Sequence, residues 1–138
     1  MRDAIRIDGL TEFTRNLAQF EAALPRALRL ATGDAADAVV DYARPRVPRR
    51  TGRARQSLRA TSIGDAVRLT EGGPRAPYMP WLDFGGRVGR RGSVHRPYLR
   101  QGRYLHKGYL VKRDTGVIRR VLTRALLNAA DRAGIEVT

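Results

Sequence analysis

The chain has 138 residues, a formal net charge of +14 and no cysteine, which excludes disulfides, thiolate zinc sites and cysteine nucleophiles. Its length fits one domain over residues 1–138, large enough to bury a core without a disulfide or a metal. The segment Met1–Leu10 lacks the apolar stretch of a signal peptide, and no run of the chain is long enough to cross a bilayer. We therefore expect a soluble protein, made and assembled in the cytoplasm of a cell, with no membrane partner.

The first predicted elements are a short strand and a long helical region. Ala4–Ile7 alternates as a strand does, and apolar residues then recur at steps of three and four, which predicts a helix with one face toward the core. That face comprises Leu10, Phe13, Leu17, Phe20, Leu24, Leu28, Ala31, Ala35, Val39 and Tyr42. Pro25 lacks an N–H and clashes one turn back, so we expect a break near it, with a single kinked helix as the alternative. Pro45 and Pro48 end the helical region.

The positive charge lies in two windows that contain no acidic residue. Residues 44–64 carry seven arginines, and residues 85–113 carry seven arginines and two lysines. We expect flexible basic segments at 44–56 and 86–113 within these windows. The second segment is glycine-rich and long for a loop in a compact domain, so we interpret it as functional or partly disordered before assembly.

The region between the two windows predicts a hairpin and a short helix. Ser57–Ile63 and Ala66–Thr70 have strand character and flank a Gly64-Asp65 turn, which favours a β-hairpin at 57–70. The aromatic cluster Tyr78–Phe84 predicts one or two helical turns, closed by Gly85-Gly86.

A last helix is predicted over Thr115–Ala133, capped by Asp114 or Thr115 and ended by Gly134, with a final strand at 135–137. Its inward face comprises Val117, Ile118, Val121, Leu122, Ala125, Leu126 and Ala129. We therefore expect an α+β fold in which long N-terminal and C-terminal helices pack on a small antiparallel sheet.

The sequence offers little that is typical of an enzyme. His95 and His106 have no carboxylate nearby in the sequence to orient them, and we interpret both as surface or interface residues. Asp83 lies among aromatic residues, where burial would raise its pKa, but we favour a structural bond to a backbone amide or an arginine. We expect no catalytic residue, no metal and no cofactor.

The basic windows also indicate contact with nucleic acid. Their arginines suit phosphates, and Tyr98, Tyr104 and Tyr109 lie among them, where they either stack on bases or anchor the segment to the core. No sequence-reading module is present, so any DNA contact is expected to involve the backbone.

Three short motifs in the middle of the chain carry a resemblance to a known family. Residues 48–58 read PRRTGRARQSL and resemble P-x-x-T-G-x-L-x-x-S followed by Ile or Leu. Residues 78–85 read YMPWLDFG and resemble Y-A-x-x-V/L-E-F-G, and residues 96–99 read RPYL and resemble R/P-P-F-L. Their order is similar to that of the tail-component family of small siphophage neck proteins, related to the tail-completion proteins of lambdoid phages. The chain departs from these patterns at Ala54, Met79 and Asp83.

The resemblance implies a structural virion protein without catalytic activity. Such a protein forms a ring, six-fold like the tail tube, at the head–tail neck or the head-proximal end of the tail, where it completes or terminates the tail and joins it to the head. Its partners are other copies of itself, neighbouring neck and tail proteins, and the DNA backbone in the channel. On residues alone, the alternative is a DNA-binding protein without sequence specificity.

Two sets of residues follow from this interpretation. Those expected at subunit interfaces or in the structural motifs are Pro48, Thr51, Gly52, Ser57, Tyr78, Trp81, Asp83, Phe84, Gly85, Pro97 and Tyr98. Those expected to face a partner or DNA are Arg49, Arg50, Arg53, Arg55, Arg87, Arg90, Arg91, Arg96, Arg100 and Arg103.

Overall fold

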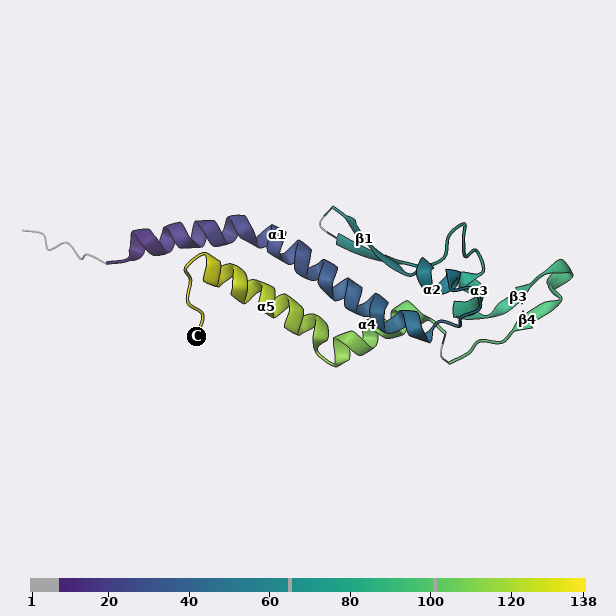
Figure 1. The fold of residues 1–138 in the computed structure, drawn as a ribbon. Coiled ribbons are helices and arrows are strands. Elements are labelled where there is room, and N and C mark those ends of the chain that lie inside the picture. Colours follow the sequence, from purple (N-terminus) through teal and green to yellow (C-terminus); the bar gives the residue numbers. More distant parts are fainter. Residues whose placement is uncertain (1–7, 65, 101) are drawn as a thin grey trace, which may run out of the picture.

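The computed structural model describes residues 8–64, 66–100 and 102–138, so the strand predicted at 4–7 lies outside the described residues. The molecule is elongated, and helix α1 (Leu10–Ala43) runs along more than half of it (Figure 1). Helix α5 (Val117–Arg132) lies antiparallel beside α1, and α4 (Tyr104–Asp114) continues that layer toward the C-terminal end of α1. The α+β fold class is confirmed.

Helix α1 continues through Pro25, so the predicted break is wrong and the alternative of one helix holds. A proline removes one backbone hydrogen bond and bends a helix without ending it when packing holds the flanking turns. Here the turns after Pro25 contribute Ala31, Ala35 and Val39 to the core, and Figure 1 shows the axis of α1 bending along its length.

The N-terminal part of the predicted apolar face does not reach the core. Leu10, Phe13 and Leu17 are 54%, 52% and 46% exposed. The later members of this face are half-buried or buried, from Phe20 and Leu24 to Ala31 and Ala35, along the part of α1 that lies beside α5. The periodicity identified an apolar face correctly, but no described element of this chain covers its first two turns. We call Leu10, Phe13 and Leu17 the α1 apolar patch.

The C-terminal helices form a helical hairpin that the sequence predicted only in part. The interpretation of 87–113 as a long loop is wrong, because α4 begins at Tyr104 and runs to Asp114. Gly116, with a φ of 77°, precedes α5 as its N-cap, so the predicted cap at Asp114 or Thr115 is also wrong. Gly134 ends α5 as predicted, with a φ of 75°.

The final strand predicted at 135–137 is absent from the described structure. Instead, the Ile135 N–H donates to the carbonyl oxygen of Ala130 at 2.9 Å, which folds the chain back on the end of α5. This contact is typical of a helix that ends at a left-handed glycine.

The predicted hairpin at 57–70 is confirmed, with strands β1 (Arg59–Ile63) and β2 (Ala66–Thr70). Ser57 is not in it, because residues 53–57 form the short helix α2 (Arg53–Ser57), which follows the 3-10 turn η1 (Arg44–Arg46). The hairpin packs against α1.

A second hairpin lies in the basic region, where none was predicted. It consists of β3 (Gly86–Val88), the turn η2 (Arg90–Gly92) and β4 (Val94–Arg96), and it projects at one end of the molecule beyond α3 (Met79–Phe84) (Figure 1). We call it the basic hairpin.

The main core lies where the C-terminal end of α1 meets these short elements. It is built from side chains of α1, α2, α3 and α4, together with Val47 after η1 and Leu58 after α2. Its buried members are Val40, Ala43, Val47, Ala54, Leu58, Met79, Leu82 and Tyr104. The segments that carry the first and second sequence motifs therefore pack on one another and on α1.

Candidate functional site

The first motif forms a turn and a short helix. Gly52 has a φ of 86°, a conformation that favours glycine, and its carbonyl oxygen accepts the first helical hydrogen bond of α2 from Gln56 N–H at 3.0 Å. The Thr51 hydroxyl oxygen accepts a long bond from Arg53 N–H at 3.4 Å, and Pro48 is exposed beside this turn. The predicted turn at Thr51-Gly52 is therefore present, and it positions Arg53 at the surface.

Ser57 of the same motif connects α2 to the segment that follows β2. Its buried hydroxyl donates to the Ala54 carbonyl oxygen at 2.6 Å and accepts from Gly72 N–H at 3.0 Å. Because both bonds are internal, Ser57 has a structural role and is not available to a partner.

Replacing Ser57 with alanine is expected to lower the free energy of unfolding by about 2 kcal/mol, because the buried Gly72 N–H is left without an acceptor. Urea denaturation measures the change. The matched control is Ser62→Ala on β1, where the side chain is exposed and the expected change is within about 0.5 kcal/mol. Equal losses in the two variants would refute this role for Ser57.

Asp83 in the second motif holds the start of α4. Its side chain is 5% exposed, and Oδ1 accepts from Tyr104 N–H at 2.9 Å, while its carbonyl oxygen accepts from Arg103 N–H at 3.1 Å. These bonds satisfy two backbone donors at the N-terminus of α4, where Arg103 adopts a left-handed φ of 56°. Of the two roles considered for Asp83, the structural bond to an amide is the one found.

The second and third motifs meet through glycines. A Cβ on Gly85 would lie 2.7 Å from the carbonyl oxygen of Arg96, and one on Gly102 would overlap the carbonyl oxygen of Asp83. Nearby, the indole N–H of Trp81 donates to the Gly86 carbonyl oxygen at 2.9 Å. The backbone at Gly85 lies so close to that at Arg96 that a side chain would not fit, which explains why glycine follows the aromatic cluster.

A buried polar cluster lies behind this junction. Alongside Asp83 it contains Glu71, Arg96 and Tyr104, and Glu71 Oε2, Arg96 Nε and the Tyr104 hydroxyl lack hydrogen-bond partners among the described residues. Burial, together with the neighbouring Asp83 carboxylate, raises the pKa of Glu71 to about 8. Burial likewise raises the pKa of Tyr104. Neither Glu71 nor Tyr104 was predicted to belong to a site, because their partners are distant in the sequence.

The raised pKa of Glu71 predicts a pH-dependent stability. The folded protein holds a proton that the unfolded chain releases above its usual pKa of 4.5, so this stabilisation is complete below about pH 4.5 and is lost as the pH rises through about 8. Allowing for partial exposure, we expect a loss of about 2 kcal/mol across that window, measured by urea denaturation. Glu71→Gln should flatten the profile. The control Glu21→Gln, exposed on α1, should leave it unchanged. An identical slope in all three proteins would contradict the prediction.

Arginines of the first window divide into internal and external groups. Arg44 and Arg46 donate to the carbonyl oxygens of Leu58 and Tyr42 at 2.9 and 2.6 Å. Arg55, predicted to face a partner or DNA, is half-buried and donates to the carbonyl oxygens of Val47 at 2.7 Å and Pro45 at 3.0 Å, so two of its donors are engaged within the subunit. Its guanidinium thus supplies hydrogen bonds to two carbonyl oxygens just after the end of α1, where the helix no longer provides donors. Arg44 and Arg46 remain exposed despite their bonds, and Arg49, Arg50, Arg53 and Arg59 are exposed as well.

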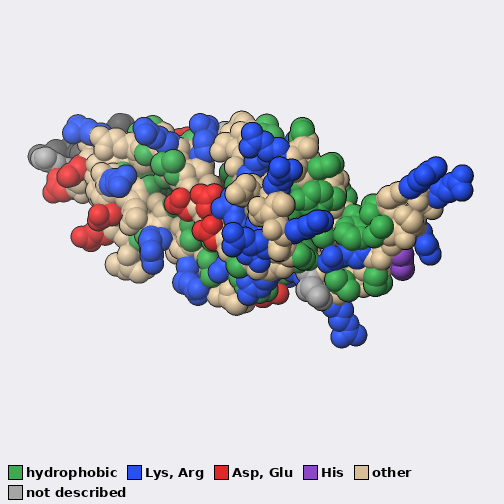
Figure 2. Space-filling model, turned by 45° about the vertical axis from the view of Figure 1, so that its right-hand side comes forward, with side chains coloured by type: hydrophobic (Ala, Val, Ile, Leu, Met, Phe, Trp, Pro, Cys, Tyr) green, Lys and Arg blue, Asp and Glu red, His purple; other side chains and the backbone are tan. Residues whose placement is uncertain are grey.

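Arginines of the second window are mostly exposed. Arg87, Arg90 and Arg91 lie on the basic hairpin, and Figure 2 shows basic side chains at the tip of this projection, whereas acidic side chains gather toward the opposite end. Arg100 is also exposed. Arg103 is exposed with its guanidinium 5.0 Å from the Phe84 ring centre.

Arg96, predicted to face a partner or DNA, is half-buried and lies against Trp81. Its guanidinium lies 5.4 Å from the Trp81 ring centre, and its Nε is buried. The reason is that β4 turns this residue toward α3 and the polar cluster. The neighbouring His95 is exposed, as is His106 on α4.

Several predicted interface residues are large and exposed. Phe84 and Tyr98 are 52% and 55% exposed, and Val88 and Val94 of the basic hairpin are exposed beside them in the chain. Tyr78 is exposed at the edge of a pocket next to Arg53. Trp81 is half-buried, and Pro97 is exposed. We call Phe84, Val88, Val94 and Tyr98 the hairpin apolar patch.

Residues 8–64, 66–100 and 102–138 contain no group of three or more His, Asp or Glu side chains placed to hold a metal ion. No helix in this part of the chain has the length and apolar character needed to span a membrane. Comparison with family models, curated proteins and solved structures finds no match to this chain.

Proposed function

We propose that this chain is a structural protein of a long-tailed bacteriophage, located in the virion, which forms a ring at the head–tail neck or the head-proximal end of the tail. The single observation that carries the proposal is the exposure of large apolar side chains at two separate places. The α1 apolar patch lies on the first turns of α1, and the hairpin apolar patch lies around the basic hairpin. Apolar side chains that group into a contiguous exposed patch mark a surface that another molecule covers, whereas singly exposed ones do not.

The placement of the two patches supports a ring rather than a two-fold dimer. They differ in composition and lie toward opposite ends of an elongated subunit (Figure 1). When one patch of a subunit docks on a different patch of the next, the contact is head-to-tail and closes into a ring if the rotation permits. A six-fold ring would match the tail tube that the family resemblance implies.

The packing of the motifs also supports the proposal. Gly85 of the second motif lies against Arg96 and Pro97 of the third, and Ser57 of the first is bonded to the segment that leads to the second. The three patterns that resemble the tail-component family therefore form one structural unit, as expected if they specify a shared fold. In this proposal the ring completes or terminates the tail, and no catalytic step is required.

The direct test is electron microscopy of the purified protein, combined with mass photometry. A closed ring with a fixed subunit number is the expected result, and labelled protein should lie on the head–tail axis of the virion. A protein that stays monomeric at all accessible concentrations and is missing from virions would overturn the proposal.

The second candidate is DNA-backbone binding, and the basic hairpin favours it. Arg87, Arg90 and Arg91 are exposed on a projecting element, and no acidic residue lies in that window. Fluorescence anisotropy with a labelled duplex distinguishes the candidates. A DNA-binding protein should lose about tenfold or more in affinity between low and physiological salt, and Arg90→Ala/Arg91→Ala should reduce that salt dependence.

A further inference from the structure

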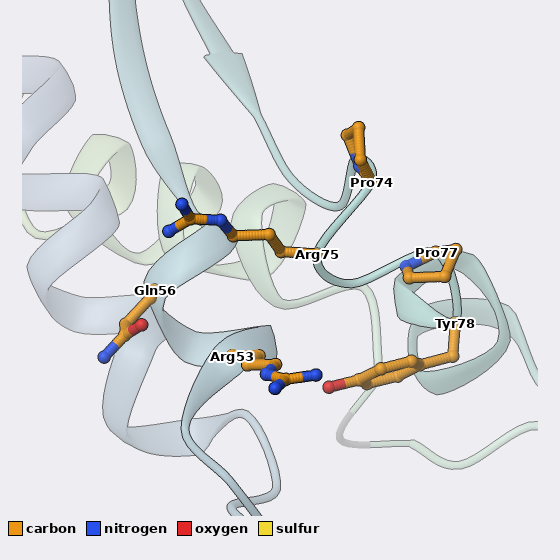
Figure 3. A pocket seen from close by; sticks show the side chains of 6 residues that line it. All are labelled: Arg53, Gln56, Pro74, Arg75, Pro77 and Tyr78. Atoms are coloured by element: carbon orange, nitrogen blue, oxygen red, sulfur yellow. The ribbon is translucent and has the colours of Figure 1, made fainter.

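A pocket lies between α2 and the 74–78 segment, and its lining residues belong neither to the two apolar patches nor to the basic hairpin. It has a volume of about 620 Å³ and is lined by Arg53, Gln56, Pro74, Arg75, Pro77 and Tyr78. An adjoining hollow of about 380 Å³ shares Arg53 and Arg75 and adds Arg59. Figure 3 shows the Arg53 side chain extending toward the hydroxyl end of Tyr78, with Arg75 and Gln56 on the other side of the opening. We call the two hollows together the arginine pocket.

The charge of the arginine pocket is uncompensated. No acidic side chain lines either hollow, and the guanidinium groups of Arg53, Arg59 and Arg75 have no ion pair among the described residues. Three cations from three different elements therefore converge on one concave surface. Guanidinium groups bind carboxylates and phosphates through paired hydrogen bonds, so the natural ligand of such a surface is an anion.

The walls of the pocket are held in place by backbone contacts. The bond from Gly72 N–H to Ser57 Oγ fixes the chain after β2 to α2, which carries Arg53. Within the 74–78 segment, Ala76 N–H donates to the Gly73 carbonyl oxygen at 3.0 Å, and Met79 N–H donates to that of Ala76 at 3.1 Å. The side chains of Ala76 and Met79 are buried, so they fix the segment that carries Arg75 and Tyr78 to the protein interior. A pocket ordered before binding loses less entropy when a ligand enters.

Shape and apolar surface favour a peptide over a duplex as the source of the anion. Two prolines and a tyrosine ring supply apolar walls, and the volume is in the range of about 300–1,000 Å³ that is usual for pockets that enclose small ligands or side chains. Duplex phosphates are more readily reached by the projecting basic hairpin. We propose that the arginine pocket binds an acidic protein segment, with Arg53 and Arg75 pairing with an Asp or Glu carboxylate and Tyr78 packing beside the peptide chain. This inference does not require the ring.

Fluorescence anisotropy with a labelled tetraglutamate peptide tests the pocket, using the full-length chain at low salt. The variant is Arg53→Ala/Arg75→Ala, and the control is Arg90→Ala/Arg91→Ala, which removes the same charge from the basic hairpin. We expect the pocket variant to weaken peptide binding at least about tenfold, because two charge-assisted contacts are lost, and the control to change it less than about twofold.

Three outcomes would overturn the inference: no saturable peptide binding by the wild-type chain, equal losses in the two variants, or loss of duplex binding rather than peptide binding in the pocket variant. Circular dichroism checks that both variants are folded. Sedimentation velocity then identifies the source of the segment. Reduced self-association in the pocket variant places the acidic segment on a second copy of this chain, whereas unchanged self-association with lost peptide binding places it on another protein. Failure of the ring itself would leave the peptide titration unaffected.

Discussion

Gly102→Ala is expected to destabilise the fold by about 3 kcal/mol or more, a large part of the total stability of a domain this size. The added Cβ would overlap the carbonyl oxygen of Asp83 and lie 3.1 Å from that of Leu99. Both atoms belong to backbone that is already engaged, since the Asp83 carbonyl accepts from Arg103 N–H and the Leu99 carbonyl accepts from Gly102 N–H. Neither can move away without breaking the connection between α3 and α4.

The matched control is Gly33→Ala in α1, where an added Cβ meets nothing within 4 Å. Alanine is favoured over glycine inside a helix by about 1 kcal/mol, so this variant should be stabilised. Urea denaturation of both variants and the wild type provides the comparison. A Gly102→Ala protein as stable as the wild type would show that the backbone at Gly102 does not lie this close to the Asp83 carbonyl oxygen.

Local sequence signals predicted the elements that depend on local chemistry. The hairpin at 57–70 was found because β-branched and apolar residues flank a glycine turn, and the end of α5 was found because Gly134 adopts a left-handed conformation. The same local reasoning failed at Pro25, since the packing of the later turns of α1 outweighs the cost of one lost hydrogen bond.

The sequence did not predict elements that are stabilised by residues far away in the chain. Helix α4 begins in an arginine- and glycine-rich segment, and its start depends on Asp83, which is 21 residues away. Its Gly108 packs against Val39 of α1, where a side chain would not fit without displacement, so a residue that weakens an isolated helix is required by tertiary packing. Composition alone could not reveal either contact.

In the candidate site, too, the sequence predicted what depends on local composition and missed what depends on distant contacts. Arginine clustering predicted a basic surface, and exposed arginines at 49, 50, 87, 90 and 91 are consistent with it. Clustering could not distinguish those from Arg55 and Arg96, which satisfy backbone carbonyls or pack on an aromatic ring. Likewise, helical periodicity identified the apolar face of α1, but the element that covers such a face is decided by tertiary or quaternary structure.

The uncovered α1 apolar patch leads to the second large prediction. Phe13→Asp/Leu17→Asp should abolish self-association while leaving the monomer folded. Both side chains are about half exposed in the isolated subunit, at 52% and 46%, so the substitutions remove little from its own core. In an assembled ring the same positions would be buried against the next subunit. Each lost apolar contact is worth about 1.5–3 kcal/mol, and burying a carboxylate without a partner adds several more.

Association should therefore weaken at least about 100-fold, since each 1.4 kcal/mol changes a dissociation constant tenfold. Thr11→Asp/Ala18→Asp is the control, because it adds the same charge to exposed positions on the same turns of α1 but outside the patch. Mass photometry measures the oligomer, and thermal unfolding measured by circular dichroism confirms that each monomer is folded. If both double variants assemble like the wild type, the patch is not a contact between subunits. If both fail equally, added negative charge is the cause and the apolar side chains are not. Loss of the ring in the patch variant alone would show that the face left uncovered in the monomer is the surface through which subunits associate.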